Sequence, residues 1–283
     1  MLPSPSLTGS IMSDVERATV RSRHPIKVSA QVGLQLGTFK DQRAAWIGAD
    51  ELGVDVIFNW DHFFPSIPGA DPTGSNLEAY MLLGSMAEVT HQAQIGSLVT
   101  CNSYRNPNLL ADMARTLDHI SGGRFVLGIG SGWMERDYNE YGYELGTAGS
   151  RLRDLARDLP IIEDRLGKVN PGPVNGHIPL LIGGGGEKVT LRLVAQHADI
   201  WHGGGSLEVI AHKLSVLDDW CAKVGRDPSE IECAIELKQD QEADIEAYIA
   251  LGISHFVINH IGPEYDLGRL RDVIRWRDER RAS

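Results

Sequence analysis

The sequence holds little cysteine and none of the common metal-binding motifs. Its 283 residues include three cysteines, at positions 101, 221 and 233, and no CxxC pair. An odd number without paired spacing argues against a disulfide framework, so we expect a protein of the reducing cytoplasm. There is also no HExxH, and no HxH follows the first predicted strand. A metal-dependent hydrolase is therefore unsupported, and we predict no metal site.

Long apolar runs and an excess of positive charge are missing as well. No apolar segment approaches the roughly 18 residues of a membrane helix, and the residues up to His24 lack the apolar core of a secretory signal. The net charge is −11 and the pI is about 5.3. This acidic balance argues against nucleic acid or an anionic membrane as a partner, and we expect a small-molecule substrate instead.

The chain has an ordinary globular composition, with 42% hydrophobic and 23% charged residues. We expect residues 1–26 to form a flexible N-terminal tail and residues 27–283 to form one domain. Eight predicted strands alternate with eight predicted helices, and the strands lie at 28–36, 54–59, 94–99, 124–129, 179–182, 198–201, 231–237 and 256–259. This alternation predicts a single (β/α)8 TIM barrel, with an open doubly wound sheet as the alternative.

An acid and a histidine, Asp61 and His62, follow the second predicted strand directly. Active sites of such barrels lie at the C-terminal ends of the strands, and histidine titrates near neutrality. The pair is therefore a candidate proton donor or hydrogen-bonding pair beside a substrate. The alternative is that Asp61 caps the loop while His62 packs in the core.

Two further pairs follow predicted strands. Tyr104 and Arg105 come after the third strand and are candidates to contact a cofactor ring or an anionic tail, or else they form an ordinary surface loop. Trp201 and His202 end the sixth strand and are typical of a ring-stacking and hydrogen-bonding pair. A buried tryptophan with a polar neighbour explains the second pair equally well.

Four consecutive glycines, Gly183, Gly184, Gly185 and Gly186, lie between the fifth strand and a helix predicted at 187–197. Without Cβ atoms, their backbone N–H groups can approach a phosphate at the helix N-terminus, although a tight turn is the simpler alternative. A second glycine group at 128–132 does not match the GxGxxG spacing of dinucleotide sites. Close packing of the backbone is an equal explanation for it.

The stretches 112–124 and 127–133, with the segments around Asp61, Tyr104 and the four glycines, resemble the bacterial luciferase-like oxidoreductases. The similarity is closest to the branch that uses the deazaflavin coenzyme F420, and it covers about residues 28–260. The resemblance implies a TIM barrel in which Asp61 and His62 line the pocket at the reactive face of the ring. It also implies that Ser97 and Leu98 lie near a non-prolyl cis peptide that supports the ring, and that residues 183–186 hold the tail phosphate.

Two departures from the family limit what the resemblance transfers. Trp133 stands where sugar-phosphate dehydrogenases of the family carry a catalytic glutamate, so that reaction is in doubt. The segment 167–179 is also short, which predicts a more open pocket. The expected function is therefore F420-dependent hydride transfer with an unidentified organic substrate. The alternatives are an FMN-dependent monooxygenase and a catalytically silent cofactor-binding protein, and the resemblance further implies a homodimer.

Overall fold

A computed structural model describes residues 24–67 and 69–282. The strands are β1 (Lys27–Val32), β2 (Val56–Asn59), β3 (Gln94–Ser97), β4 (Thr100–Cys101), β5 (Phe125–Gly130), β6 (Leu180–Gly183), β7 (Ile200–Gly203), β8 (Glu232–Glu236) and β9 (His255–His260). The α-helices are α2 (Phe39–Glu51), α3 (Ala79–Val89), α4 (Pro107–Ser121), α5 (Glu135–Tyr141), α6 (Ala148–Leu166), α7 (Thr190–His197), α8 (Leu207–Val224), α9 (Ile245–Ala250) and α10 (Gly268–Ala282). Short 3-10 turns lie at Asn102–Tyr104, Pro228–Glu230 and Gln239–Asp244.

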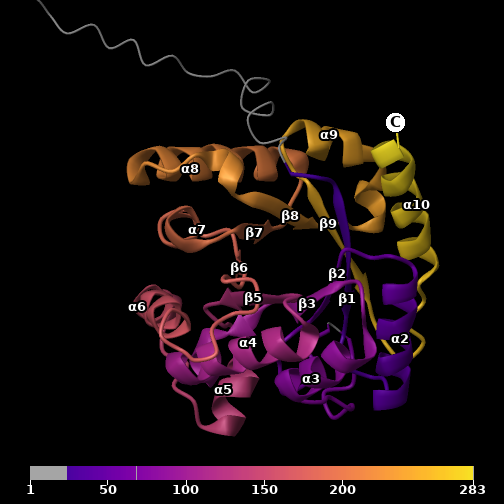
Figure 1. The fold of residues 1–283 in the computed structure, drawn as a ribbon, viewed down its shortest axis with the longest axis horizontal. Helices are drawn as coiled ribbons and strands as arrows, with labels where there is room; N and C mark the ends of the chain where they lie inside the picture. Colours follow the sequence, from indigo (N-terminus) through magenta and orange to yellow (C-terminus); the bar gives the residue numbers. More distant parts are fainter. Residues whose placement is uncertain (1–23, 68, 283) are drawn as a thin grey trace, which may run out of the picture.

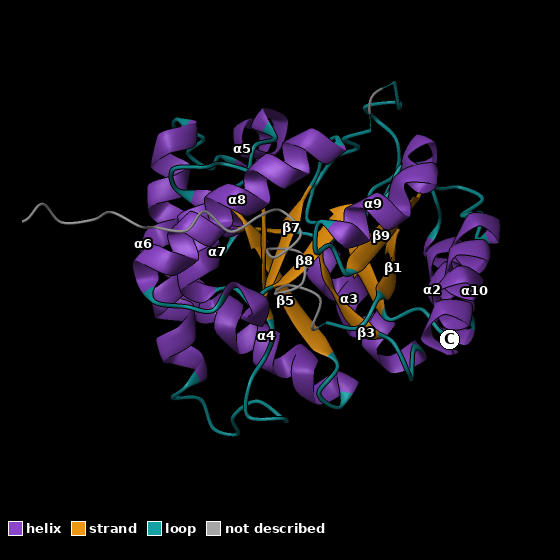
Figure 2. Ribbon diagram, turned by 90° about the horizontal axis from the view of Figure 1, so that it is seen from above, coloured by secondary structure: helices purple, strands orange, loops and turns teal. Residues whose placement is uncertain are grey.

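The strands form a closed parallel barrel, with the helices arranged around it (Figures 1 and 2). β1 pairs with both β2 and β9, and β3 pairs with β5, which closes the ring. β3 and β4 both pair with β5, at Ile95↔Phe125 and Thr100↔Ile129, so they share one position of the barrel. The predicted eight-stranded barrel is confirmed, and the open-sheet alternative is wrong because the first and last strands are paired.

The predicted third strand, 94–99, is interrupted between β3 and β4. The Leu98–Val99 peptide bond there is cis, next to the position that the resemblance implied. Glycines on the neighbouring strands make room for this segment. A Cβ atom on Gly128 would overlap the Ser97 carbonyl oxygen, and one on Gly130 would lie 2.7 Å from Val99. Close backbone packing, rather than dinucleotide binding, therefore explains this glycine group.

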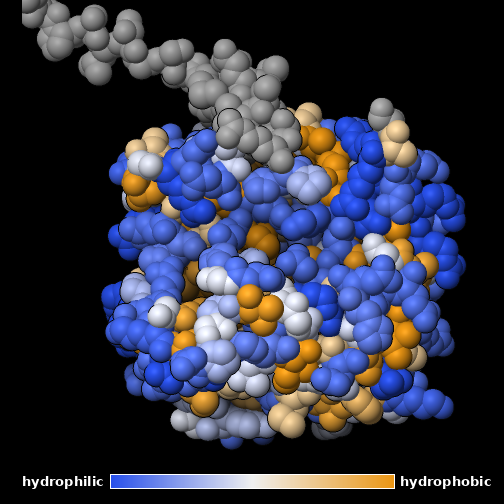
Figure 3. Space-filling model, viewed as in Figure 1, coloured by the Kyte–Doolittle hydropathy of each residue, from blue (hydrophilic) through white to orange (hydrophobic). Residues whose placement is uncertain are grey.

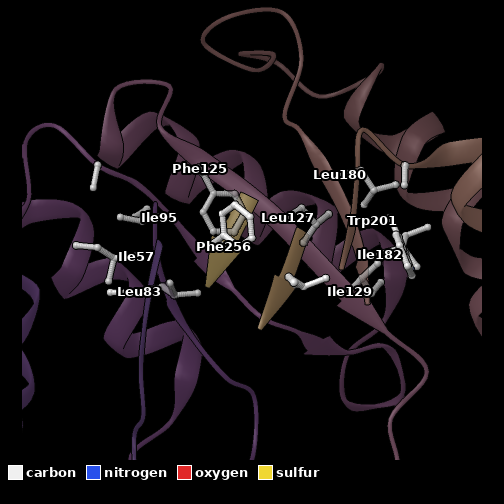
Figure 4. Packing of buried hydrophobic residues seen from close by; sticks show 14 of the residues in the cluster. Ile57, Leu83, Ile95, Phe125, Leu127, Ile129, Leu180, Ile182, Trp201 and Phe256 are labelled. Atoms are coloured by element: carbon white, nitrogen blue, oxygen red, sulfur yellow. The ribbon is translucent and has the colours of Figure 1, made fainter. Parts of the chain in front are cut away.

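The core has two layers because successive side chains of a strand point to opposite faces. Inside the barrel, Val56, Phe58, Val126, Leu181 and Val257 belong to a small apolar cluster. The larger cluster fills the space between barrel and helices, and Figure 4 shows part of it. This alternation decides which residues at the strand ends face the barrel axis.

Helix boundaries agree with the sequence at some ends and differ at others. The sequence Asn106-Pro107 favours a helix start, and Asn106 indeed caps α4 through its side chain with Pro107 as its first residue. Ser150 is a second candidate cap by residue type, but the N-cap of α6 is Thr147. Ser150 completes a capping box with Thr147, because it lies three residues further on. The glycine-rich connection 130–149 reads as a loop in the sequence, but it contains the short helix α5.

The N-terminal part of the predicted tail, residues 1–23, lies outside the described residues. His24 bonds through Nε2 to the Ser229 carbonyl at 2.9 Å, and Ile26 packs against the core. The part of the tail that is described therefore contacts the barrel.

The face shown in Figure 3 is largely hydrophilic, and its apolar residues lie in small separated groups. Within the described ranges, no helix is long and apolar enough to cross a bilayer.

The homodimer stays a prediction. Met81 on α3 and Leu109 on α4 are exposed apolar side chains, and we propose these two helices as candidate surfaces for it.

Candidate active site

A cavity of about 360 Å³ opens at the C-terminal ends of the strands. Its volume lies within the range of about 300–1,000 Å³ found for small-molecule sites. The predicted site residues that line it are Asp61, His62, Leu98, Tyr104, Gly183, Gly184 and His202. We call the side formed by Asp61, His62, Tyr104 and Trp133 the polar wall, and the side formed by Gly183, Gly184 and His202 the glycine wall.

Asp61 is held in place by its neighbours. Its side chain is 1% exposed and accepts two hydrogen bonds from Arg105, at 2.6 and 3.0 Å. The Cys101 amide donates a third at 3.0 Å. Burial raises the pKa of Asp61, and the positive charge and hydrogen bonds of Arg105 oppose that rise. Asp61 therefore anchors the polar wall rather than presenting a free carboxylate.

Arg105 connects the base of the polar wall to helix α3. Its guanidinium also donates to Glu78 at 2.7 Å, and it lies 4.2 Å from the centre of the Tyr80 ring. Glu78 in turn caps α3 by accepting a bond from the Met81 amide. Arg105, expected to contact a cofactor, thus has its donors directed at two carboxylates of the protein.

His62 is oriented by an acid that the sequence analysis did not identify. Its Nδ1 lies 2.8 Å from Oδ2 of Asp137, a fully buried residue on α5. A carboxylate at this distance favours the tautomer with a proton on Nδ1, which leaves Nε2 as the exchangeable nitrogen. His62 lines the cavity and keeps 15% of its side chain exposed. The arrangement suits proton transfer at Nε2.

Asp137 also organises the aromatic side chains behind the polar wall. The Tyr104 hydroxyl donates to its Oδ2 at 2.8 Å, and the Phe63 amide donates to its Oδ1 at 3.3 Å. The rings of Phe63 and Tyr104 stack with centres 4.7 Å apart. Burial, more than the nearby charges, raises the pKa of Tyr104, so this residue stays a neutral donor.

Trp201 and His202 point to opposite sides of β7. Trp201 is fully buried among the residues between barrel and helices (Figure 4), and its indole N–H donates to the Gly184 carbonyl at 2.9 Å. It does not line the cavity, so the structure gives no support to ring stacking by this residue. His202 faces the cavity, and its Nε2 has no partner among the described residues. Burial lowers the pKa of His202 to about 4, with a smaller contribution from His255, so the ring is neutral at pH 7.

His255 and its partners fill the barrel below His202. Nδ1 of His255 lies 2.6 Å from Glu232, and Nε2 bonds to the Ser29 hydroxyl. Lys27 pairs with Glu232 at 2.7 Å. Burial opposes ionisation of Glu232, but His255 and Lys27 outweigh it and lower the pKa of Glu232 to about 2. These groups form hydrogen bonds and ion pairs with one another. None of them is a partner for Nε2 of His202.

The four glycines continue the glycine wall away from the barrel axis. Gly184 has φ +123, which favours glycine, and its amide donates to the His202 carbonyl at 3.0 Å. Gly185 and Gly186 are exposed and do not line the cavity. α7 begins at Thr190 and not at 187, and no side chain caps it. The glycines therefore end in a short turn, with the uncapped N-terminus of α7 beyond it.

Ser97 and Leu98 lie beside each other with different surroundings. Leu98 lines the cavity, and its carbonyl accepts a hydrogen bond from Gln31 at 2.7 Å. Ser97 is fully buried and does not line it.

The segment 167–179 joins α6 to the start of β6, at the end of the barrel opposite the cavity. A short segment at that end does not open the pocket. The prediction of a more open pocket from the length of this segment is therefore wrong.

A signal for Asp137 was present in the sequence. Glu135 and Asp137 lie in the first turn of α5, and Gly142 ends the helix in the left-handed region with φ 73. Acidic residues followed by a glycine stop are typical of a short helix. Its contact with His62 spans 75 positions of the chain, and no local pattern encodes such a contact.

A family model described as luciferase-like monooxygenase matches residues 20–239. The chain belongs to this family. The resemblance seen in the sequence is thereby confirmed, as is the prediction of a luciferase-like oxidoreductase enzyme. Among relatives, an F420-dependent glucose-6-phosphate dehydrogenase of Microbacterium testaceum is 27% identical over 215 residues, covering 69% of this chain. The aligned region spans only 62% of that relative's length.

Two solved structures share the fold. An F420-dependent secondary alcohol dehydrogenase in complex with an F420–acetone adduct has a TM-score of 0.76 at 16% identity, covering 88% of this chain and 98% of that chain. The oxygenating constituent of 3,6-diketocamphane monooxygenase of Pseudomonas putida, in complex with FMN, has a TM-score of 0.59 at 17% identity. It covers 74% of this chain and 67% of that chain. Structures with this fold therefore include proteins that bind F420 and proteins that bind FMN.

Proposed function

We propose that this chain is a coenzyme F420-dependent oxidoreductase that transfers a hydride between the deazaflavin ring and a small organic substrate. The observation that carries the proposal is the Asp137–His62 pair, with Nδ1 fixed at 2.8 Å and the ring at the cavity. Hydride transfer to or from an oxygen-bearing carbon needs a proton donor or acceptor at that oxygen. A protein that only stores a cofactor has no use for such a pair.

The cavity suits a flat ring held against the barrel. Leu98 and Val99 supply an apolar support, and Val99 packs against Gly183, where a Cβ atom would lie 2.9 Å from its Cγ1. His202 offers a neutral ring whose Nε2 has no partner among the described residues. When bound there, a deazaflavin supplies or accepts a hydride, and the protein contributes position and electrostatics.

The glycine segment suits the anionic tail of such a cofactor. Gly185 and Gly186 are exposed, and no side chain caps α7 beyond them. The Leu191 amide already donates to the Gly186 carbonyl at 2.9 Å, so the exposed glycine backbone is what an anion would approach. Lys213 lies beside Gly185, where a Cβ atom would be 3.6 Å from its Cε. Lys213 also pairs with Glu187 at 2.6 Å, so an anion at the glycines would share this cation with that carboxylate.

The protein's chemical contribution lies at the substrate oxygen. His62 gives a proton to that oxygen through Nε2 during reduction, or takes one during oxidation. Asp137 holds the ring in one tautomer through its contact with Nδ1. Tyr104, which donates to the same carboxylate, keeps Asp137 oriented. Asp137 is therefore a positioning residue, and His62 is the residue that moves the proton.

Titration with F420 and with FMN on separate preparations tests the cofactor. We expect submicromolar binding of F420 and much weaker binding of FMN. The reverse order would establish the alternative, an FMN-dependent monooxygenase. The F420 branch appears among the relatives' names, which is why we place it first.

Paired variants test the proton transfer. We expect His62→Ala to keep cofactor affinity within a few-fold and to lower single-turnover hydride transfer by about 10²–10⁴, the usual effect of a lost acid or base. Asp137→Asn should lower the rate less and change its pH profile, because the ring loses the carboxylate that fixes the proton on Nδ1. An unchanged single-turnover rate for His62→Ala would remove His62 from the mechanism.

A further inference from the structure

The cavity offers no lysine or arginine to a substrate. None of its lining residues, all of which belong to the described part of the chain, is lysine or arginine. Asp61 is the one carboxylate among them, and Arg105 already pairs with it. His202 is neutral at pH 7 because burial lowers its pKa to about 4. His62, the other ring that can carry a proton here, already has Asp137 as its partner at 2.8 Å. A phosphate or carboxylate entering here would therefore lose its hydration without gaining an unpaired counter-ion.

The cations nearest this region are held by other groups. Arg105 donates to Asp61 and Glu78. Arg151 donates to the carbonyls of Gly132 and Leu145, behind the backbone that lines the cavity. Lys213 pairs with Glu187 at 2.6 Å and lies on the glycine side. Each of these three cations is therefore already paired within the protein, and none of them lines the cavity.

The polar wall ends in an exposed aromatic surface. Trp133 lines the cavity yet keeps 64% of its surface exposed, and its ring meets the His62 ring edge-on at 5.3 Å. Trp60 also lines the cavity. A flat ligand at the mouth would cover the Trp133 face while its reacting end lies beside His62. Aromatic faces of this kind favour planar, conjugated ligands.

We propose that the site takes an uncharged, planar, conjugated carbonyl compound, or the corresponding alcohol, and rejects phosphorylated or carboxylated ones. This inference rests on the proposed function and specifies its substrate class. In the reducing direction, the carbonyl π bond breaks, a C–H bond forms with the hydride of the reduced deazaflavin, and an O–H bond forms with the proton from His62. Two electrons pass to the carbonyl carbon, and the product is the alcohol.

Cinnamaldehyde and 4-carboxycinnamaldehyde form a matched pair of probes, because they differ by one carboxylate far from the reacting carbon. Calorimetry on the protein loaded with oxidised F420 measures their binding without turnover. We expect the neutral aldehyde to bind at least about tenfold more tightly. Equal binding, tighter binding of the carboxylate, or no binding of either compound would overturn the inference.

Trp133→Arg tests the same idea by adding a cation at the mouth. It should weaken binding of cinnamaldehyde and strengthen binding of the carboxylate, so that the preference narrows or reverses. Val224→Arg, at an exposed position at the end of α8, is the matched control and should leave the preference unchanged. An unaltered preference in Trp133→Arg would contradict the assignment of Trp133.

Turnover of the same compounds separates this inference from the proposed function. Selective binding of the neutral aldehyde without any oxidation of reduced F420 would refute hydride transfer and retain the binding preference. Turnover of both aldehydes with similar kcat/KM would support the proposed function and overturn the substrate class.

Discussion

The two walls of the cavity differ in how fully their polar groups are paired. On the polar wall, Asp61 accepts three hydrogen bonds, and Asp137 accepts bonds from Tyr104 and Phe63 and contacts His62. On the glycine wall, Nε2 of His202 has no partner among the described residues, and beyond this wall Gly185 and Gly186 are exposed outside the cavity. The carboxylates of the polar wall have their hydrogen-bond partners within the protein. In the described part of the chain, the glycine wall leaves a histidine nitrogen unpaired, to which a ligand can bond.

This difference separates positioning from binding. A proton-transfer residue must be held in one geometry before the substrate arrives, which the buried carboxylates on the polar wall achieve. A cofactor with a flat ring and an anionic tail needs open backbone and space, which glycines supply. Variants on the polar wall should therefore affect stability and turnover, while variants on the glycine wall should affect ligand affinity and pH response.

The largest effect on the polar wall should come from Arg105→Met. This change leaves the Asp61 carboxylate buried without its partner, and breaking a buried pair on one side costs about 3–5 kcal/mol. Urea unfolding at pH 7 measures the loss in the free energy of unfolding. The double variant Asp61→Asn with Arg105→Met should recover part of that loss, because no uncompensated charge is left.

Lys168→Met is the control for this prediction. It removes an ion pair with Asp164 in which both side chains are more than 60% exposed. Surface pairs contribute about 0–1 kcal/mol, so its stability should barely change. Equal losses for Arg105→Met and Lys168→Met would mean that the Asp61–Arg105 pair does not anchor the wall.

On the glycine wall, His202 should make stability depend on pH. Its pKa falls from 6.5 to about 4 on folding, so between these values the unfolded chain binds a proton that the folded chain does not. Stability contributed by the neutral ring is therefore complete above pH 6.5 and declines as pH falls toward 4, by at most about 3 kcal/mol. Urea unfolding between pH 7 and 4 should show a shallower decline for His202→Asn than for the parent.

Glu232 provides an internal contrast for that measurement. Its pKa is about 2 in the folded protein and 4.5 otherwise, so its contribution to stability is lost only below about pH 4.5. If the free energy of unfolding declines only below about pH 4.5, and by the same amount in the parent and in His202→Asn, then His202 is not the source of the decline.

The smallest expected effect concerns the four glycines. Gly185→Asp places a negative charge in the exposed segment proposed for the cofactor's anionic tail, and we expect cofactor affinity to fall about tenfold to a hundredfold. Gly185 has no positive φ, so the stability of the fold should change by less than about 0.5 kcal/mol. Gly185→Asn has a similar size without the charge and should bind almost normally. If both variants bind as tightly as the parent, the glycines form only a turn.

The barrel was predictable because its signals are local. Strand runs bounded by glycine, helix caps such as Asn106–Pro107, and stops such as Gly122 recur along the chain and fix the order of elements. The capping box of α6 shows the limit of such signals, since Thr147 and Ser150 are both good caps and only their geometry shows which one begins the helix. The missed α5 is short and lies in a long connection, where periodicity has too few residues to register.

The sequence by itself determined the barrel, the family and the presence of an acid and a histidine at the end of the second strand, because these depend on residue type and spacing along the chain. The tertiary structure decided what each group does. It turned Asp61 toward Arg105, brought Asp137 from α5 to His62, and directed Trp201 into the layer between barrel and helices. The physical reason is that pairing and burial depend on the distance in space between residues up to 75 positions apart in the chain, which no local pattern records.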